Sequence, residues 1–100
     1  MNLGILVTSD KHLDHVIGLV KAAVGKAEKI SLFAMDRGTL LLENERLKEL
    51  CHLDGVDISL CRHSAEGLGV NTENIQKDIV CGSQFNNAMM NHEADKVIVL

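Results

Sequence analysis

Tryptophan and tyrosine are absent from this sequence, and two phenylalanines stand among its 100 residues. The chain also lacks any two adjacent lysine or arginine residues, and its net charge is -4. Because a nucleic-acid surface needs a basic stripe and commonly uses aromatic side chains to stack on bases, we expect no nucleic-acid partner. Hydrophobic residues nevertheless make up 46% of the chain, so the core must be built mainly from aliphatic side chains.

Long apolar runs are missing as well. No stretch approaches the roughly 20 apolar residues of a membrane-spanning helix. The first ten residues, MNLGILVTSD, lack the basic start and the small-residue cleavage site of a signal peptide. The three cysteines, spaced ten and twenty residues apart, do not form the pattern of a disulfide framework. These absences favour a reducing compartment, and we expect a cytoplasmic protein with no membrane contact.

Residues 3–7, LGILV, form a continuous apolar run, which is typical of a strand that is buried on both faces. Three further segments that are rich in apolar residues, 29–35, 56–60 and 96–100, are also expected to form strands. The segments between them carry apolar residues at helical spacing, and strands that alternate with helices form parallel sheets. Proline-rich or low-complexity linkers are absent. We therefore expect one domain over residues 1–100, an α/β fold built as a small flavodoxin-like three-layer sandwich with a four- or five-stranded, mainly parallel sheet.

Helices are expected where apolar residues recur at steps of three and four. The first helix should follow the capping oxygens of residues 8–10 and stop at Gly25. Ser83 is expected to cap the last helix, which leads into the final strand. The other helices are expected within residues 40–53, directly after Cys61, and around residues 71–79.

Cys61 stands where an apolar strand gives way to the polar, glycine-punctuated segment RHSAEGLG. The thiolate is the reactive form of cysteine, and unpaired N–H groups at the start of a helix can stabilise it. Arg62 and His63 could add positive charge, and Ser64 could donate a hydrogen bond. The glycines allow a sharp backbone turn that leaves the sulfur open. This pattern favours a nucleophilic cysteine, and the alternative is a small hydrophobic side chain that packs at the end of a strand.

The segment CRHSAEGLG resembles the Cys-x7-Gly segment of the DsrE/TusD-like sulfur-relay family, in which the cysteine follows the third strand and carries a persulfide. The resemblance covers most of the chain. GILVTSD is similar to the first strand and loop of that family, ISLFAMDRGTLLL to its second strand and turn, and VCGSQFNNAMMNHEADKVIVL to its closing segment. The resemblance implies that Cys61 is the sulfur carrier and that Gly69 is the matching glycine. Many members have a basic residue directly before that glycine, whereas this chain has Leu68, so positive charge near the sulfur would come from Arg62 or His63.

What the resemblance implies is a sulfur-transfer function for a single DsrE-like domain. Cys61 would accept a sulfane sulfur from a donor protein and pass it from the resulting persulfide to an acceptor protein, as a sulfurtransferase does. Such an exchange needs no cofactor and no metal. Family members commonly assemble into trimers or hexamers, so we expect a homo-oligomer. Members without the cysteine serve as structural or docking subunits, and a non-catalytic assembly or binding subunit is therefore an alternative.

Cys81 is a candidate for a second thiol because it lies close to the expected start of the last helix. It could resolve or carry the sulfur of Cys61, or it could simply pack. If the two thiols formed a disulfide on oxidation, the chain could instead be a thiol-based peroxide reductase. Cys51 lies on the expected apolar face of the second helix and is interpreted as a core residue.

A metal site is not expected from the sequence. Ligand types are available, but no CxxC or HxxxH pair has the spacing that is customary for zinc. The residues considered as ligands are Cys51, His52, Cys61, His63, Cys81 and His92. We assign none of them to a metal on the basis of spacing.

Overall fold

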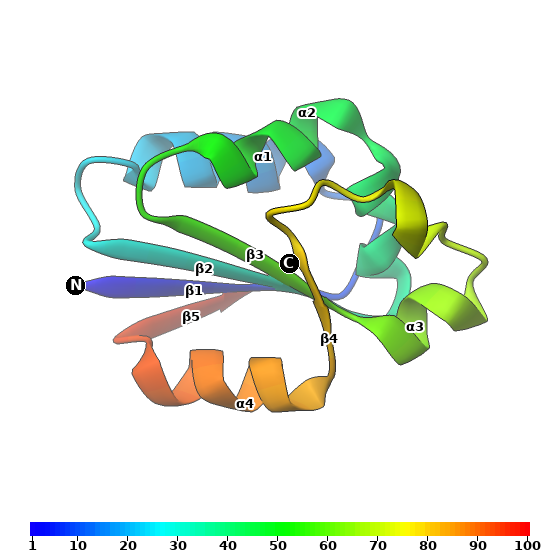
Figure 1. Ribbon diagram of the computed structural model, residues 1–100. Helices are drawn as coiled ribbons and strands as arrows, with labels where there is room; N and C mark the ends of the chain where they lie inside the picture. Colours follow the sequence, from blue (N-terminus) through cyan, green and yellow to red (C-terminus); the bar gives the residue numbers. More distant parts are fainter.

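The computed structural model describes the backbone of residues 1–100 and every side chain except that of Asn74. A five-stranded sheet forms its centre, with the strand order β4-β3-β2-β1-β5 (Figure 1). Every neighbouring pair of these strands is parallel. The strands are β1 (Asn2–Val7), β2 (Lys29–Ala34), β3 (Val56–Cys61), β4 (Val80–Gly82) and β5 (Lys96–Val99). The arrangement confirms the predicted α/β fold class with a parallel sheet between helical layers.

Helices cover both faces of the sheet (Figure 1). On one face lie α1 (Leu13–Ala23) and α2 (Glu45–Lys48), and on the other lies α4 (Gln84–Glu93). The remaining helical pieces are the 3-10 helices η1 (Asp36–Glu43), η2 (Glu49–His52) and η3 (Thr72–Asn74), and the short helix α3 (Arg62–Gly67). The chain returns across the sheet through α4, so β5 lies beside β1 rather than beside β4.

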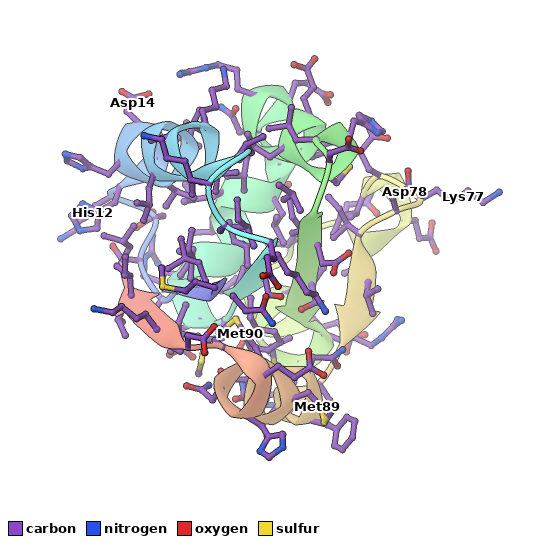
Figure 2. The ribbon with its side chains drawn as sticks, turned by 90° about the vertical axis from the view of Figure 1, so that its left-hand side faces the viewer. His12, Asp14, Lys77, Asp78, Met89 and Met90 are labelled. Carbon is purple, nitrogen blue, oxygen red and sulfur yellow. The ribbon has the colours of Figure 1, made fainter. Side chains whose placement is uncertain are left out.

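Alternate residues of the strands pack into two separate cores, one on each face of the sheet. Ile5 and Leu32, which pair across β1 and β2, belong to a large aliphatic cluster that includes the buried face of α1. The opposite face holds a small cluster of Phe33, Cys61 and Met90. Met90 lies on the side of α4 that faces the sheet (Figure 2). The side chain of Cys61 therefore belongs to the face that α4 covers.

A helix was expected to occupy part of residues 40–53, and helical structure is found there, but it is divided into the separate pieces η1, α2 and η2. Asn44 interrupts the run, since its backbone is extended and its side-chain oxygen accepts a hydrogen bond from the N–H of Arg46 at 2.9 Å. Gly38 in η1 passes so close to the carbonyl of Val7 that a side chain there would collide with it. Tertiary packing, rather than helical periodicity, sets the backbone of this segment.

The predicted helix ends are confirmed in two places. Gly25 follows α1 with a φ of 84°. Ser83 caps α4, and its hydroxyl oxygen accepts a hydrogen bond from the N–H of Phe85 at 3.2 Å. The cap expected from residues 8–10 is wrong, because α1 begins only at Leu13 and its N-cap residue makes no side-chain capping bond.

Two further segments differ from the expectation. Asp10 forms an ion pair with Arg37 of η1, with Oδ2 and Nη2 3.1 Å apart, instead of capping a helix. Around residues 71–79 the helical structure is limited to η3, after which the chain enters the edge strand β4. Of the helices that the structure describes, none combines the length and the hydropathy that a bilayer crossing requires.

Candidate functional site

The carboxyl ends of β2, β3 and β4 and the starts of α3 and α4 surround an open cavity of about 910 Å³. Open parallel sheets commonly place ligands and catalytic groups at this edge. Among the residues singled out in the sequence, those that line the cavity are Cys61, Arg62, His63, Ser64 and Cys81. The other lining residues are Met35, Asp36, Glu66, Gly82, Ser83 and Gln84. The structure thus brings two of the three cysteines to one cavity.

Cys61 is both the last residue of β3 and the N-cap of α3. Its backbone is extended, with φ −83° and ψ 112°, so the strand runs directly into the helix. The side chain packs in the small core with Phe33 and Met90, and only 4% of the residue is exposed. Because it also lines the cavity, Cys61 lies at the boundary between the core and the open space.

Two opposing effects act on the pKa of the Cys61 thiol. Burial raises the pKa by disfavouring the charged thiolate. Hydrogen bonds from the hydroxyl and backbone N–H of Ser64, the side-chain amide of Gln84 and the backbone N–H of His63 outweigh burial, so the pKa is lowered. The nucleophilic thiolate is therefore more populated at a given pH than in an ordinary cysteine.

Gln84 is a site residue that no feature of the sequence identified. It is the first residue of α4, and its Nε2 also lies 3.7 Å from the sulfur of Met35. A capping box of Ser83 and Asn86 fixes the start of this helix, and the N–H of Ser83 donates to Asn86 Oδ1 at 3.0 Å. The expected cap at Ser83 indicated that a helix begins at Gln84, but it did not indicate that this helix lies beside Cys61. That position depends on the pairing of β3 with β4.

Arg62 and His63 are exposed, and both line the cavity. His63 acts on the sulfur of Cys61 through its backbone N–H. Across the part of the chain that the structure describes, the main interactions that lower the pKa of Cys61 are hydrogen bonds. The stabilisation of the thiolate thus depends on these bonds more than on neighbouring positive charge.

Gly69 lies outside the cavity lining and follows the end of α3. Its φ is 73°, in the left-handed region that favours glycine. Its N–H donates to the carbonyl of Glu66 at 3.2 Å, and the N–H of Val70 donates to the carbonyl of Ala65 at 2.9 Å, which is the pattern of a Schellman motif. The spacing from Cys61 to Gly69 therefore spans α3, with the cysteine at its start and the glycine just beyond its end.

Cys81 lies in β4, the edge strand beside β3. In this pair Cys81 is opposite Leu60, and Gly82 is opposite Cys61, so the two cysteines occupy neighbouring strands one position out of register. Cys81 is half-buried and lines the same cavity as Cys61. Because it is paired with Leu60 and packs against the large aliphatic cluster, the side chain of Cys81 faces the opposite side of the sheet from that of Cys61, although both residues line the cavity.

The turn after β2 completes the wall of the cavity. Asp36 has a φ of 50°, in the left-handed region that aspartate tolerates better than most residues. The hydroxyl of Thr39 donates a hydrogen bond to the carbonyl oxygen of Asp36 at 2.8 Å and holds this turn. As a result, the segment Met35–Asp36 turns along the cavity and adds a thioether and a carboxyl group to its lining.

Comparisons with known proteins bear on the fold. No protein-family model matches the sequence, and no curated protein matches it. The structure is similar to that of the ychN protein from E. coli, with a TM-score of 0.70, 18% sequence identity and 100% of both chains covered. It is also similar to MTH1491 from Methanobacterium thermoautotrophicum, a protein of unknown function, with a TM-score of 0.77, 17% identity, and 99% of this chain and 98% of that chain covered. At these identities the likeness establishes the fold alone: this chain shares with the ychN protein and MTH1491 an α/β fold in which helices flank a five-stranded parallel sheet.

Proposed function

We propose that this chain is a sulfur-transfer protein that carries a persulfide on Cys61 and passes the outer sulfur to a partner thiol. The observation that supports this most is the position of Cys61 at the start of α3 and at the wall of an open cavity, where neighbouring donor groups lower the pKa of its thiol although the residue is buried. Donors that favour a thiolate would also favour the terminal anion of a persulfide, since bonds to charged acceptors are the stronger ones. The activity is that of a sulfurtransferase, and it requires no cofactor.

The transfer consists of two exchange steps at sulfur. In the first, the Cys61 thiolate attacks the outer sulfur of a donor persulfide, so a new S–S bond forms, the donor's S–S bond breaks and the donor thiolate leaves. In the second, an acceptor thiolate attacks the outer sulfur, and the Cys61 thiolate leaves. A thiol of lower pKa leaves faster, so the hydrogen bonds from Ser64 and Gln84 assist the second step. No oxidant or reductant is consumed, because the sulfane sulfur only passes between thiols.

A thiol-based peroxide reductase is the second candidate, and the shared cavity of Cys61 and Cys81 favours it. In that reaction the Cys61 thiolate would reduce a peroxide and become a sulfenic acid, and the Cys81 thiolate would then form a disulfide with release of water. A dithiol reductant would restore both thiols. This candidate predicts a Cys61–Cys81 disulfide after peroxide treatment, whereas sulfur transfer predicts a mass gain of one sulfur after polysulfide treatment.

The partners in this proposal are sulfur-donor and sulfur-acceptor proteins and further copies of the chain. Phe85 and Met89 are exposed on α4, and Val80 is exposed on the edge strand β4. Figure 2 shows Met89 at the flank of α4, where it lines a pocket together with Val80 of β4. We expect a second copy to cover these side chains in a trimer or hexamer. Because Phe85 directly follows Gln84, this contact would adjoin the site.

Delivery of sulfur tests the proposal. The protein is treated with polysulfide, desalted and mixed with glutathione as the acceptor thiol. We expect one equivalent of glutathione persulfide per chain, together with the return of the protein to its unmodified mass. Cys61→Ser should neither load nor deliver sulfur, and the matched variant Cys51→Ser should do both. Equal delivery by Cys61→Ser would refute the proposal and favour a non-catalytic assembly or binding subunit.

A further inference from the structure

Three side chains that can bind a metal ion meet away from the carboxyl ends of the strands. Cys51 and His52 belong to η2, which precedes β3, and Asp78 precedes β4. One ligand atom of each, the Cys51 sulfur, a His52 ring nitrogen and an Asp78 carboxylate oxygen, lies within 4.8 Å of the other two. His52 Nδ1 and Asp78 Oδ2 are 3.8 Å apart. We call these three residues the Cys-His-Asp cluster.

The spacing within the Cys-His-Asp cluster suits a small transition-metal ion. In a tetrahedral zinc site, Zn–S distances of about 2.3 Å and Zn–N or Zn–O distances of about 2.0–2.2 Å place neighbouring ligand atoms roughly 3.3–3.6 Å apart. The separation of 3.8 Å between His52 and Asp78 is close to that spacing. The side chains of His52 and Asp78 are 54% and 69% exposed, so rotation about their side-chain bonds can close the remaining gap.

Cys51 gives the cluster a fixed anchor. It is half-buried and packs against the large aliphatic core, so its sulfur has less freedom than the other two ligand atoms. Burial raises the pKa of the Cys51 thiol, and the nearby carboxylate of Asp78 raises it further. A divalent cation between the two groups would reverse both effects, because a bound metal ion deprotonates a coordinating thiol and neutralises the carboxylate. An exposed His–Asp ion pair alone contributes little to stability.

We propose that Cys51, His52 and Asp78 bind one Zn²⁺ ion, with a water molecule as the fourth ligand. A set that combines thiolate, imidazole and carboxylate is typical of zinc, whereas Mg²⁺ and Ca²⁺ prefer sites built from oxygen atoms. The ion joins η2 to the segment that enters β4. Because β4 has three residues and carries Cys81, zinc binding holds this edge strand in place and stabilises the folded chain. The zinc site stands independently of sulfur transfer at Cys61.

Cobalt gives a direct test, since Co²⁺ substitutes for Zn²⁺ and its absorption reports its ligands. The full chain carrying Cys61→Ser and Cys81→Ser is freed of metal with a chelator, exchanged into chelator-free buffer and titrated with Co²⁺. We expect a near-ultraviolet thiolate-to-cobalt band and the strong visible bands of a tetrahedral ion, both saturating at one Co²⁺ per chain and both lost on adding Zn²⁺. Because two cysteines are replaced, the thiolate band must come from Cys51. Zn²⁺ should also raise the Tm of this chain by several degrees.

Variants of the ligand residues distinguish metal binding at the Cys-His-Asp cluster from non-specific metal binding elsewhere on the protein. His52→Gln and Asp78→Asn should each weaken Co²⁺ binding at least about tenfold, since the loss of even an outer-shell partner costs 10–100-fold. His12→Gln and Asp14→Asn are matched controls that should leave binding unchanged, because they lie on the opposite side of the molecule from Asp78 (Figure 2). Absence of the thiolate band, or binding that His52→Gln and Asp78→Asn leave unchanged, would overturn the proposal. Sulfur loading at Cys61 is measured separately and is unaffected by either result.

Discussion

The side-chain amide of Gln84, in the first turn of α4, stabilises the thiolate of Cys61 at the end of β3 and so lowers the pKa of this thiol. Ser64 of α3 lowers the pKa of the same thiol. The sulfur is therefore held between two helices that begin at the same edge of the sheet. The edge strand β4 is what brings the start of α4 to this position, because it pairs with the last residues of β3.

Replacing Gln84 with alanine should make Cys61 less reactive. The substitution removes one hydrogen bond that favours the thiolate, so the pKa of Cys61 should rise toward its ordinary value. A hydrogen bond worth about 1 kcal/mol corresponds to a roughly fivefold slower alkylation at neutral pH. Stopped-flow labelling with a fluorogenic thiol reagent measures the rate, and Gln76→Ala is the matched control. A rate equal to that of the control would show that the amide does not stabilise the thiolate.

The thiol of Cys61 should become reactive at a lower pH than the thiol of Cys51. The hydrogen bonds around Cys61 outweigh burial and lower its pKa, so its alkylation should begin at lower pH than that of an ordinary cysteine. Burial and the Asp78 carboxylate raise the pKa of Cys51, so its alkylation should need higher pH. Isotope-coded alkylation from about pH 5 to pH 10, followed by peptide mass spectrometry with a chelator present, gives both profiles in one sample. Coincident midpoints, or the reverse order, would contradict the described surroundings of the two thiols.

Gly69→Ala should destabilise the protein, and Gly67→Ala should not. Gly69 has a φ of 73°, where a β-carbon costs roughly 1–2 kcal/mol. Gly67 is helical and has open space around its Cα, so alanine there should raise the free energy of unfolding by about 0.5–1 kcal/mol. Urea denaturation of the two variants and the parent measures these differences. Equal stability of the two variants would argue against the Schellman motif after α3.

Phe85→Ser should weaken the proposed homo-oligomer. Phe85 is 69% exposed on α4, and burying its ring against a second copy would stabilise the assembly through its apolar surface. Light scattering coupled to size-exclusion chromatography should show a shift from the trimer or hexamer toward the monomer. Leu68→Ser, an exposed apolar residue that follows α3, is the matched control and should keep the parent's mass. If the parent is a monomer, or if Phe85→Ser leaves the assembly intact, this surface is not the interface between copies.

The parallel sheet was predictable because four of its strands coincide with short segments rich in apolar residues, of which residues 3–7 form a continuous apolar run. Residues 3–7, 29–35 and 56–60 each overlap one of β1, β2 and β3, and the last run overlaps β5. Residues 40–53 were not predictable to the same degree, since their leucines are spaced like those of a helix. The extended backbone at Asn44 divides that segment, and an isolated periodicity does not reveal such an interruption.

Part of the candidate site was readable from the sequence for a similar reason. Cys61 directly follows an apolar run, so its place at the carboxyl end of a strand follows from the pattern. Gln84 could not be found in this way, because its contact with Cys61 depends on which strand lies beside β3. The Cys-His-Asp cluster could not be predicted from the sequence either. Asp78 is far along the chain from Cys51 and His52, and the three residues come together only in the folded protein.

The most direct test of sulfur transfer is to locate the sulfur after loading. The parent protein is incubated briefly with polysulfide, blocked with an alkylating reagent, digested and analysed by mass spectrometry, beside Cys61→Ser. Sulfur transfer through Cys61 predicts one additional sulfur per chain, carried on the peptide that contains Cys61 and absent from the variant. Absence of added sulfur, or sulfur spread equally over the peptides of Cys51 and Cys81, would contradict it.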